Sequence, residues 1–288
     1  MPTFRLDRLL TLNLFLPLRR AGAESRLPIL MYHSVSNERE ETVSPYYRTA
    51  ASPEIFAAHM ELLRAQGYEV LGLQAGLEKF HRKNSANAKI AVVTFDDGFR
   101  DFYTDALPVL RKHNFGGTVF LPTAFIGREQ CDFKSRACMA WDEVRESLKA
   151  GIEFGSHTVH HPKLYELDWP QIRAELKESK TTIENELGQP VRSFAYPYAF
   201  PSADKGFVKA FVETLKESGY ACNVTTKIGL AGSNDDVFTL KRLPMNSADD
   251  ESLFLAKLAG AYDWLAHPQE LSKKIRSFLS TPVSRQKS

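Results

Sequence analysis

Short apolar runs alternate with helical patterns from residue 28 to residue 224 of this 288-residue chain. Several of these runs are rich in β-branched residues and are bounded by Gly or polar residues, which is typical of buried strands. Repeated strand–helix units predict a parallel sheet, and such a sheet that closes on itself becomes an α/β barrel with its reactive groups at the carboxyl ends of the strands. We predict seven strands, at residues 28–32, 68–71, 90–95, 117–121, 152–156, 193–196 and 220–224. We predict helices from Ser52-Pro53 onward and at about 101–113, 141–150, 168–187 and 204–218.

The composition excludes several other classes of protein. Apolar residues make up 43% and charged residues 25%, as in globular domains, so the chain is neither disordered nor collagenous. Lys and Arg number 37 against 35 Asp and Glu, and this balance gives no indication of a nucleic-acid partner. Cys131, Cys138 and Cys222 are too few and too scattered for a disulfide framework or a thiolate zinc site, so we expect idle or buried thiols. No apolar run reaches the ~18–20 residues of a membrane span.

We divide the chain into three parts. Residues 1–24 form a basic and apolar segment, residues 25–245 the catalytic domain, and residues 246–288 a helical extension with a polar tail. We see no low-complexity linker inside the central part.

The N-terminal segment has more than one interpretation. The apolar run at 9–18 follows basic residues, as in a secretory signal, but Asp7 lies among them and Arg19-Arg20 stand where small residues would define a cleavage site. The segment is either an ordinary helix packed on the catalytic domain or a helix that lies on an anionic membrane surface. We therefore expect a cytoplasmic protein, with peripheral membrane contact through residues 1–24 and secretion left as alternatives.

Adjacent carboxylates follow the predicted strand at 90–95. Asp96 and Asp97, in the stretch TFDDG at 94–98, would repel each other unless a cation or a proton separates their roles. Because adjacent residues point in different directions, one carboxylate can bind a metal while the other faces a reacting water. A simple Asp-Gly turn is the alternative.

Three histidines follow the strand at 152–156. His157 and His161 are spaced i, i+4, which brings two imidazoles to one face of a helical turn, while His160 would point elsewhere. Two imidazoles and one carboxylate leave open positions on a zinc ion for water and substrate. A cluster of histidines that caps a helix is the alternative.

Two further candidate site residues lie at the ends of predicted strands. In FAYPY at 194–198, the proline fixes the backbone so that Tyr198 can present its N–H toward the barrel mouth. In MYH at 31–33, His33 would face the same mouth. Taken alone, the first pattern is more often plain packing and the second a structural histidine.

Together these residues resemble the polysaccharide deacetylase family, carbohydrate esterases that act on chitin, peptidoglycan and poly-N-acetylglucosamine. TFDDG at 94–98 matches the first motif, HTVHH at 157–161 the second, and YPY at 196–198 part of the third, within a resemblance that covers about residues 27–245. The resemblance implies a distorted (β/α)₇ barrel. It also implies that Asp97, His157 and His161 bind a divalent metal, most often Zn²⁺ with Co²⁺, Ni²⁺, Fe²⁺ or Mn²⁺ as alternatives. Asp96 would then be the general base, and the Tyr198 N–H would stabilise the oxyanion.

The chain departs from the usual pattern of this family. Ala195 stands where the third motif carries an arginine, and Ala199 replaces its glycine. The fourth, aspartate-tryptophan motif and the late Leu-x-His that supplies the general acid are not recognisable. A subgroup that acts on exported poly-N-acetylglucosamine begins with Met-Tyr-His and takes its acid from that early strand, which indicates His33. Arg242 is a candidate to replace the missing arginine, although a surface Lys-Arg pair is the more ordinary interpretation.

We therefore expect a metal-dependent hydrolase that removes N-acetyl groups from amino sugars of a polysaccharide or glycan intermediate of the cell envelope. The alternatives are a deacylase or deformylase of a small or lipid-linked sugar, a catalytically silent glycan-binding domain that keeps its metal, and a purely structural metal site. The expected partner is an N-acetylated glycan or glycolipid. Candidate residues for stacking on sugar rings are Tyr46, Tyr47, Trp141 and Phe200, although each taken alone is more often a core or ordinary surface residue.

Overall fold

Seven parallel strands close into a barrel in the computed structural model, which describes residues 5–18, 26–38, 40, 42–82 and 89–266. The strands are hydrogen-bonded in the order β2-β14-β12-β11-β10-β7-β6, and β6 pairs with β2 to complete the ring. This confirms the predicted distorted (β/α)₇ barrel. The ring strands are β2 (Ile29–Tyr32), β6 (Ile90–Phe95), β7 (Gly117–Leu121), β10 (Ile152–Ser156), β11 (Ser193–Ala195), β12 (Cys222–Ile228) and β14 (Leu240–Pro244).

The membership of the ring differs from the prediction at two strands. β5 (Glu69–Leu71), predicted as one of the seven, pairs only with β6 and lies outside the ring. β14, which was not predicted as a strand, completes the ring between β12 and β2. Its sequence LKRLP carries two charges and a proline, so it lacks the uninterrupted apolar pattern of a buried parallel strand.

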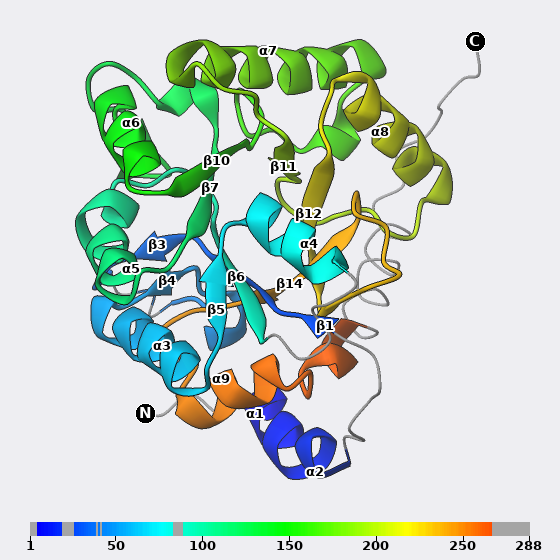
Figure 1. Cartoon of the computed structure of the whole chain (residues 1–288). Coiled ribbons are helices and arrows are strands. Elements are labelled where there is room, and N and C mark those ends of the chain that lie inside the picture. Colours follow the sequence, from blue (N-terminus) through cyan, green and yellow to red (C-terminus); the bar gives the residue numbers. More distant parts are fainter. Residues whose placement is uncertain (1–4, 19–25, 39, 41, 83–88, 267–288) are drawn as a thin grey trace.

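Helices surround the barrel, as Figure 1 shows for α3 to α8. α3 begins where the sequence predicts, because the Ser52 hydroxyl accepts a hydrogen bond from the Ile55 N–H and Pro53 occupies the first turn. α7 begins with a capping box between Asp168 and Gln171. The helices are α3 (Pro53–Ala65), α4 (Leu73–His81), α5 (Leu107–His113) after a π-helical turn at Phe102–Ala106, α6 (Trp141–Lys149), α7 (Trp169–Leu187), α8 (Lys205–Glu217) and α9 (Glu251–Leu258).

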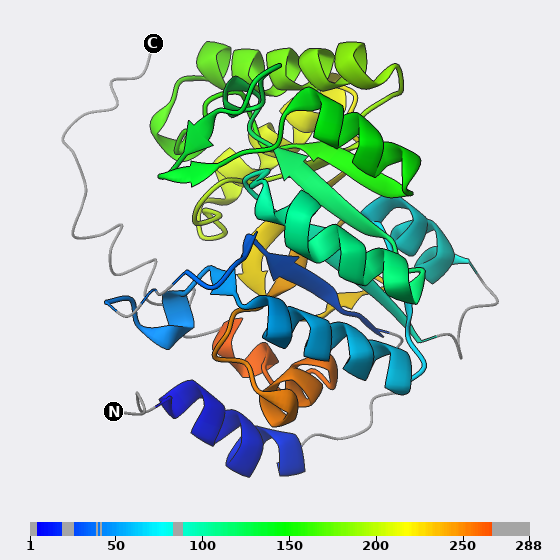
Figure 2. The same ribbon diagram turned by 90° about the vertical axis from the view of Figure 1, so that its left-hand side faces the viewer.

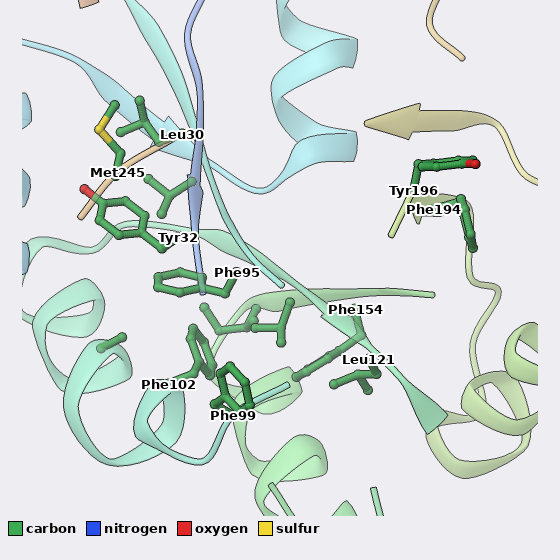
Figure 3. Packing of buried hydrophobic residues seen from close by; sticks show 14 of the residues in the cluster. Leu30, Tyr32, Phe95, Phe99, Phe102, Leu121, Phe154, Phe194, Tyr196 and Met245 are labelled. Atoms are coloured by element: carbon green, nitrogen blue, oxygen red, sulfur yellow. The ribbon is translucent and has the colours of Figure 1, made fainter. Parts of the chain in front are cut away.

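Aromatic side chains from the first strands fill the layer between barrel and helices (Figure 3). Tyr32 of β2 stacks on Phe95 of β6 at 5.7 Å between ring centroids, and Phe95 contacts Phe102 at 4.7 Å. Phe56 of α3 meets Tyr32 edge-on at 5.1 Å. This packing fixes β2 and β6, whose carboxyl ends carry His33 and the Asp96-Asp97 pair.

Three short two-stranded pairs lie in the loops of the described chain. β1 (Arg26–Leu27) pairs with β13 (Ala231–Gly232), and β3 (Ser34–Val35) pairs with β4 (Ala50–Ala51). β8 (Asp132–Phe133) and β9 (Arg136–Ala137) form a hairpin after β7.

Residues 5–18 form a helical segment, α1 (Leu6–Leu10), a π-helical turn (Thr11–Phe15) and α2 (Leu16–Leu18), that packs on the chain after β14 (Figures 1 and 2). Phe15 stacks on Trp264 at 4.8 Å, and the Trp264 indole N–H donates to the Thr11 hydroxyl at 3.0 Å. Residues 5–18 therefore form a packed helical segment, as one of the two interpretations predicts. The segment packs on the C-terminal extension and not on the barrel wall. The outward side chains of Leu6, Leu9, Leu14, Leu16 and Leu18 are exposed.

No helix in the described ranges is long and apolar enough to span a membrane. The rest of the predicted N-terminal segment, residues 1–4 and 19–24, and the polar tail at 284–288 lie outside the described residues.

Candidate functional site

The carboxyl ends of the ring strands bring the predicted site residues to one mouth of the barrel. Asp96 and Asp97 directly follow β6, His157 directly follows β10, and Tyr198 follows β11. His33 directly follows β2. Asp97, His161 and Tyr198 have φ of 71°, 53° and 57°, a left-handed conformation that is unusual for residues with a Cβ and is common at functional sites.

Asp97, His157 and His161 converge on one point. Asp97 Oδ1 lies 3.2 Å from His161 Nε2 and 3.7 Å from His157 Nε2, and the two Nε2 atoms are 3.1 Å apart. All three side chains are buried. One ligand atom from each lies within 4.8 Å of the others, so a single ion could contact all three.

The donor set fits a divalent metal. His157 Nδ1 lies 2.8 Å from the Ala195 carbonyl oxygen, so Nδ1 carries the proton there and Nε2 presents its lone pair to the other ligands. Asp97 Oδ1, which is buried, has no hydrogen-bond partner among the described residues. A buried, unpartnered carboxylate oxygen beside two imidazoles is the environment that a cation stabilises.

The electrostatics of these groups suit metal binding. Burial and the neighbouring His161 lower the pKa of His157 to about 3, so its imidazole is neutral near pH 7. Burial opposes ionisation of Asp97, but His161, His33 and Lys134 outweigh it and hold the pKa of Asp97 well below its usual range. A carboxylate and a neutral imidazole are the protonation states in which these side chains bind metals.

Asp96 points to a different partner. Both of its oxygens accept hydrogen bonds from Arg242, at 2.7 Å from Nη1 and 2.7 Å from Nη2, and Arg242 Nε donates to the Thr225 carbonyl. Burial opposes ionisation of Asp96, but Arg242 and His157 lower its pKa to about 2. Arg242 is fully buried, so the interpretation as a surface pair is wrong.

His33 and Tyr198 flank this pair of carboxylates. His33 Nε2 lies 3.9 Å from Asp96 Oδ2. Burial lowers the pKa of His33, and the charges of Asp96 and Asp97 act in the opposite direction. Tyr198 is 46% exposed and its ring contacts the His161 ring edge-on at 4.6 Å, which puts Tyr198 at the solvent side of the candidate metal ligands.

His160 and two of the four aromatic candidates lie away from the site. His160 Nδ1 is 2.7 Å from Glu175 Oε1 at the surface, as its different orientation on the turn predicts. Trp141 and Phe200 are buried in the hydrophobic core, which is the more ordinary interpretation of such residues, and so they do not stack on sugars. Tyr46 and Tyr47 line a cavity of about 180 Å³ that also has His33 in its wall.

Lys134, which sequence reasoning missed, contacts a candidate metal ligand. Its Nζ donates to Asp97 Oδ2 at 2.9 Å and lies 4.6 Å above the Phe133 ring. Lys134 and Ser135 form the turn of the β8–β9 hairpin with φ of 52° and 61°. The usual Asn-Gly or Asp-Gly signal of such a turn is absent, so nothing in the sequence indicated a hairpin here.

Comparisons show which known proteins this chain is similar to. Residues 83–221 match the family model described as polysaccharide deacetylase. The chain is 28% identical over 238 residues to Bacillus subtilis YxkH, whose name assigns it to the polysaccharide deacetylases, and covers 76% of that protein with 83% of its own length. It is 25% identical over 198 residues to a Staphylococcus aureus poly-beta-1,6-N-acetyl-D-glucosamine N-deacetylase, with 65% of each chain covered.

Solved structures share the fold. The Streptococcus pyogenes deacetylase PplD in complex with acetate superposes with a TM-score of 0.68 at 24% identity, covering 82% of this chain and 99% of that one. IcaB from Ammonifex degensii superposes with a TM-score of 0.64 at 22% identity, covering 84% and 98%.

Proposed function

We propose that this chain, whose residues 83–221 match the polysaccharide deacetylase family model, is a metal-dependent hydrolase that removes N-acetyl groups from amino sugars of a cell-envelope glycan. The observation that carries the proposal is the convergence of Asp97, His157 and His161 next to a second carboxylate, Asp96, that Arg242 holds separately. One carboxylate is thus available to a metal and the other to a reacting water. The poly-beta-1,6-N-acetyl-D-glucosamine N-deacetylase among the relatives supports this class of substrate.

Asp97, His157 and His161 would hold the metal, for which we propose Zn²⁺ because two imidazoles and one carboxylate suit it. The bound ion would supply Lewis acidity toward the acetyl carbonyl and lower the pKa of water in the site. Tyr198, at the solvent side of the ligands, would add its backbone N–H to the oxyanion, and one such donor is typically worth about 3–4 kcal/mol.

Asp96 would act as the general base. Its pKa of about 2 keeps it ionised, and Arg242 fixes both oxygens, so it can accept a proton from water without rotating away. Positioned acid–base groups contribute about 10²–10⁴-fold to rate. His33, whose lowered pKa leaves it neutral at rest, would receive that proton through a bridging water, because its Nε2 lies 3.9 Å from Asp96 Oδ2, and donate it to the departing amine. The products are then acetate and a free amino sugar.

Acetate release from N-acetylated glycans, with metal analysis of the same preparation, tests the proposal. We expect Asp96→Asn to retain its metal and lose acetate release. His33→Ala should also retain metal and turn over slowly. His157→Ala and His161→Ala should lose both metal and activity, whereas His160→Ala, on the same turn but bonded to Glu175, should lose neither. Full metal retention in His157→Ala, or unchanged turnover in Asp96→Asn, contradicts the assignments.

The cavity beside His33 favours a glycan over a small sugar. Tyr46, Tyr47 and Met31 are among its lining residues, an aromatic and apolar surface next to the group assigned to the leaving amine. A neighbouring sugar of a polymer could occupy it while the acetamide reaches the ligands. Equal kcat/KM on a monomeric and an oligomeric substrate would instead favour the deacylase of a small sugar, and sugar binding without any acetate or formate release would favour a silent binding domain.

We further propose that the protein works in the cytoplasm with α1 and α2 in peripheral contact with a membrane. The five exposed leucines of residues 5–18 support this contact, because monomeric proteins rarely gather so many apolar side chains on one short helix. Sedimentation with anionic vesicles should fall when Leu9 and Leu18 are changed to Ser, and equal sedimentation contradicts the contact.

A further inference from the structure

The β8–β9 hairpin lies against two of the candidate metal ligands, Asp97 and His161. At its turn, Lys134 donates to Asp97 Oδ2 at 2.9 Å. Beside the turn, the Phe133 ring meets the His161 ring edge-on at 5.2 Å. At its base, the backbone of Cys138 bridges to Phe99, two residues after Asp97, and the Met139 N–H donates to the Gly98 carbonyl. A change in the hairpin therefore reaches two of the three candidate ligands directly.

A cysteine stands on each side of this hairpin. β8 and β9 pair Phe133 with Arg136 and Asp132 with Ala137, so Cys131 and Cys138 are the next residues opposite each other. The Cys138 N–H donates to the Cys131 carbonyl at 2.8 Å, which continues the ladder by one pair. Opposite residues of antiparallel strands place their side chains on the same face with Cα atoms about 4.5–5.5 Å apart. A disulfide requires about 4.4–6.8 Å, so the backbone is already in the bonding range.

Both sulfur atoms are held only weakly where they are. Cys131 is half-buried with Sγ 3.7 Å from the Glu129 carbonyl oxygen, and Cys138 is buried with Sγ 3.9 Å from the Asp97 carbonyl oxygen. Thiols are poor hydrogen-bond donors, so rotation about χ1 costs little in lost bonds. Cys222 differs from both, because it lies on β12 and its Sγ accepts a hydrogen bond from Gln74 at 3.0 Å.

We propose that Cys131 and Cys138 are an oxidisable pair whose disulfide closes the base of the hairpin and holds it against Asp97. A disulfide such as oxidised glutathione is a sufficient oxidant. The more accessible Cys131 thiolate attacks one sulfur of glutathione disulfide, which forms a mixed disulfide and releases one glutathione thiolate. Burial raises the pKa of the Cys138 thiol to about 12, so the second step is the slow one. Cys138 gives its proton to the buffer, attacks the Cys131 sulfur and releases the second glutathione thiolate. Two protein thiols are oxidised, one glutathione disulfide is reduced to two thiols, and the two protons remain with the released glutathione or the buffer.

Peptide mapping of the metal-loaded full chain after treatment with oxidised glutathione tests the pairing. Lys134 and Arg136 lie between the two cysteines, so trypsin separates peptide 129–134 from peptide 137–145 unless a disulfide joins them. We expect the joined pair, and an intact protein about 2 Da lighter than the reduced form. We expect Cys222 to remain alkylatable after denaturation.

Matched serine variants define the outcome. Cys222→Ser should form the joined peptides as the wild type does, and Cys131→Ser should leave Cys138 alkylatable after denaturation. A wild type in which Cys131 carries glutathione stably while Cys138 stays free overturns the pairing. A wild type in which both thiols stay free also overturns it.

Metal retention tests the link to the ligands. In the oxidised wild type we expect slower transfer of the bound metal to a chelator than in the reduced wild type, because the closed hairpin keeps Lys134 and Phe133 over the ligands. The difference should vanish in Cys131→Ser. Equal transfer rates in oxidised and reduced wild type, with the disulfide verified by mapping, would show that the hairpin does not control access to the ligands.

Discussion

Asp96 and Arg242 form a fully buried, bidentate ion pair across 146 residues of sequence. Such a pair adds little net stability, because the desolvation of two charges offsets most of their attraction. Its value lies in what it does to Asp96: the carboxylate stays ionised, and its oxygens cannot turn toward the metal ligands. The neighbouring Asp97 has no arginine and faces the imidazoles instead. Two adjacent residues of the same type thus acquire different chemistry from their partners.

Arg242→Gln should shift the acid limb of kcat/KM to higher pH. Without the guanidinium the pKa of Asp96 rises from about 2, so a larger share of the base is protonated at acidic pH. Removing one partner of a buried pair should also lower the free energy of unfolding by about 3–5 kcal/mol. Arg242→Lys keeps the positive charge but not the two parallel hydrogen bonds of the guanidinium. It should therefore show smaller changes in both the acid limb and the free energy of unfolding. Lys241→Gln, next in sequence but half-exposed and paired with Asp235, should change neither, and an unmoved acid limb in Arg242→Gln excludes the positioning role.

Lys134→Met should strengthen metal binding. The ammonium donates to Asp97 Oδ2 at 2.9 Å, and its positive charge opposes a cation bound at the neighbouring Oδ1. Because Lys134 is 39% exposed, solvent screens the pair and its worth is about 0.2–1 kcal/mol, which corresponds to a gain of at most about fivefold in affinity. Titration of the apoprotein with Co²⁺, followed by its visible absorption, measures the change. Weaker binding in Lys134→Met would show that the lysine orients Asp97 rather than competing for it.

Sequence reasoning located the site residues far better than it described their partners. The Asp96-Asp97 pair of TFDDG and the stretch HTVHH each lie directly after a strand, where local pattern and barrel topology together fix their position. Arg242 and Lys134 could not be assigned in the same way. Each approaches its carboxylate through a tertiary contact, one from a strand with a charged pattern and the other from a hairpin turn without the usual residues.

At the scale of elements, α3 is tied to the first barrel strand through a buried histidine. His59 Nδ1 lies 2.8 Å from the Tyr32 hydroxyl, and its Nε2 lies 2.8 Å from the Asp249 carbonyl oxygen. Tyr32 immediately precedes His33, so α3, β2 and the chain before α9 meet one residue away from the candidate acid. Burial, opposed by Asp249, lowers the pKa of His59 to about 4.

Acid should weaken this junction. The unfolded chain binds a proton at His59 below about pH 6.5, whereas the folded chain does not until about pH 4. The contribution of His59 is therefore complete above pH 6.5 and is lost as the pH falls toward 4. Between pH 7 and pH 5 we expect His59 to account for about 1–2 kcal/mol of the fall in unfolding free energy. Urea unfolding of His59→Gln at both pH values should show a fall smaller by that amount, with exposed His160→Gln as the control, and an identical fall would place the acid sensitivity elsewhere.

Strand prediction succeeded where burial produces an apolar run and failed where it does not. β6, β7 and β10 were predicted with the bounds that the structure has. β14 was missed because its buried side chain at 242 is an arginine, which only a buried carboxylate makes tolerable. β5 was predicted correctly as a strand but wrongly as a ring member, because an apolar run does not reveal which neighbours it pairs with.

At the scale of the whole molecule, the N-terminal helical segment packs on the C-terminal end of the described chain, which itself packs on α3 and on β12 (Figure 2). Arg5 contacts Asp249, the Tyr262 hydroxyl donates to Asp7, and Lys257 contacts Asp249 from the other side. The backbone carbonyl oxygen of Asp249 also lies 2.8 Å from His59 Nε2, as described above. The terminal segments therefore form one unit that rests on α3.

Trp264→Ala should release the N-terminal helical segment. The change removes the stacking on Phe15 and the bond to Thr11, and we expect a loss of about 2 kcal/mol in unfolding free energy. Cleavage by trypsin at Arg8 should become faster while the barrel stays intact. Trp169→Ala, which removes a comparable stacking on Phe207 at the far side of the molecule, should not accelerate cleavage at Arg8. Equal cleavage rates in both variants would show that the segment is held by its other contacts.

The closure of the ring by β14 has a consequence for synthesis on the ribosome. β2 is the first ring strand to emerge, yet one of its two neighbours is the last. Until residue 244 has left the exit tunnel, the nascent barrel keeps an unpaired edge on β2 and another on β12, and Asp96 has no counter-charge. Every candidate ligand is translated before that moment, so metal could meet them on an open sheet. Arrest of translation before β14 should therefore leave a chain that aggregates through its edges, and the final strand both seals the sheet and supplies the guanidinium.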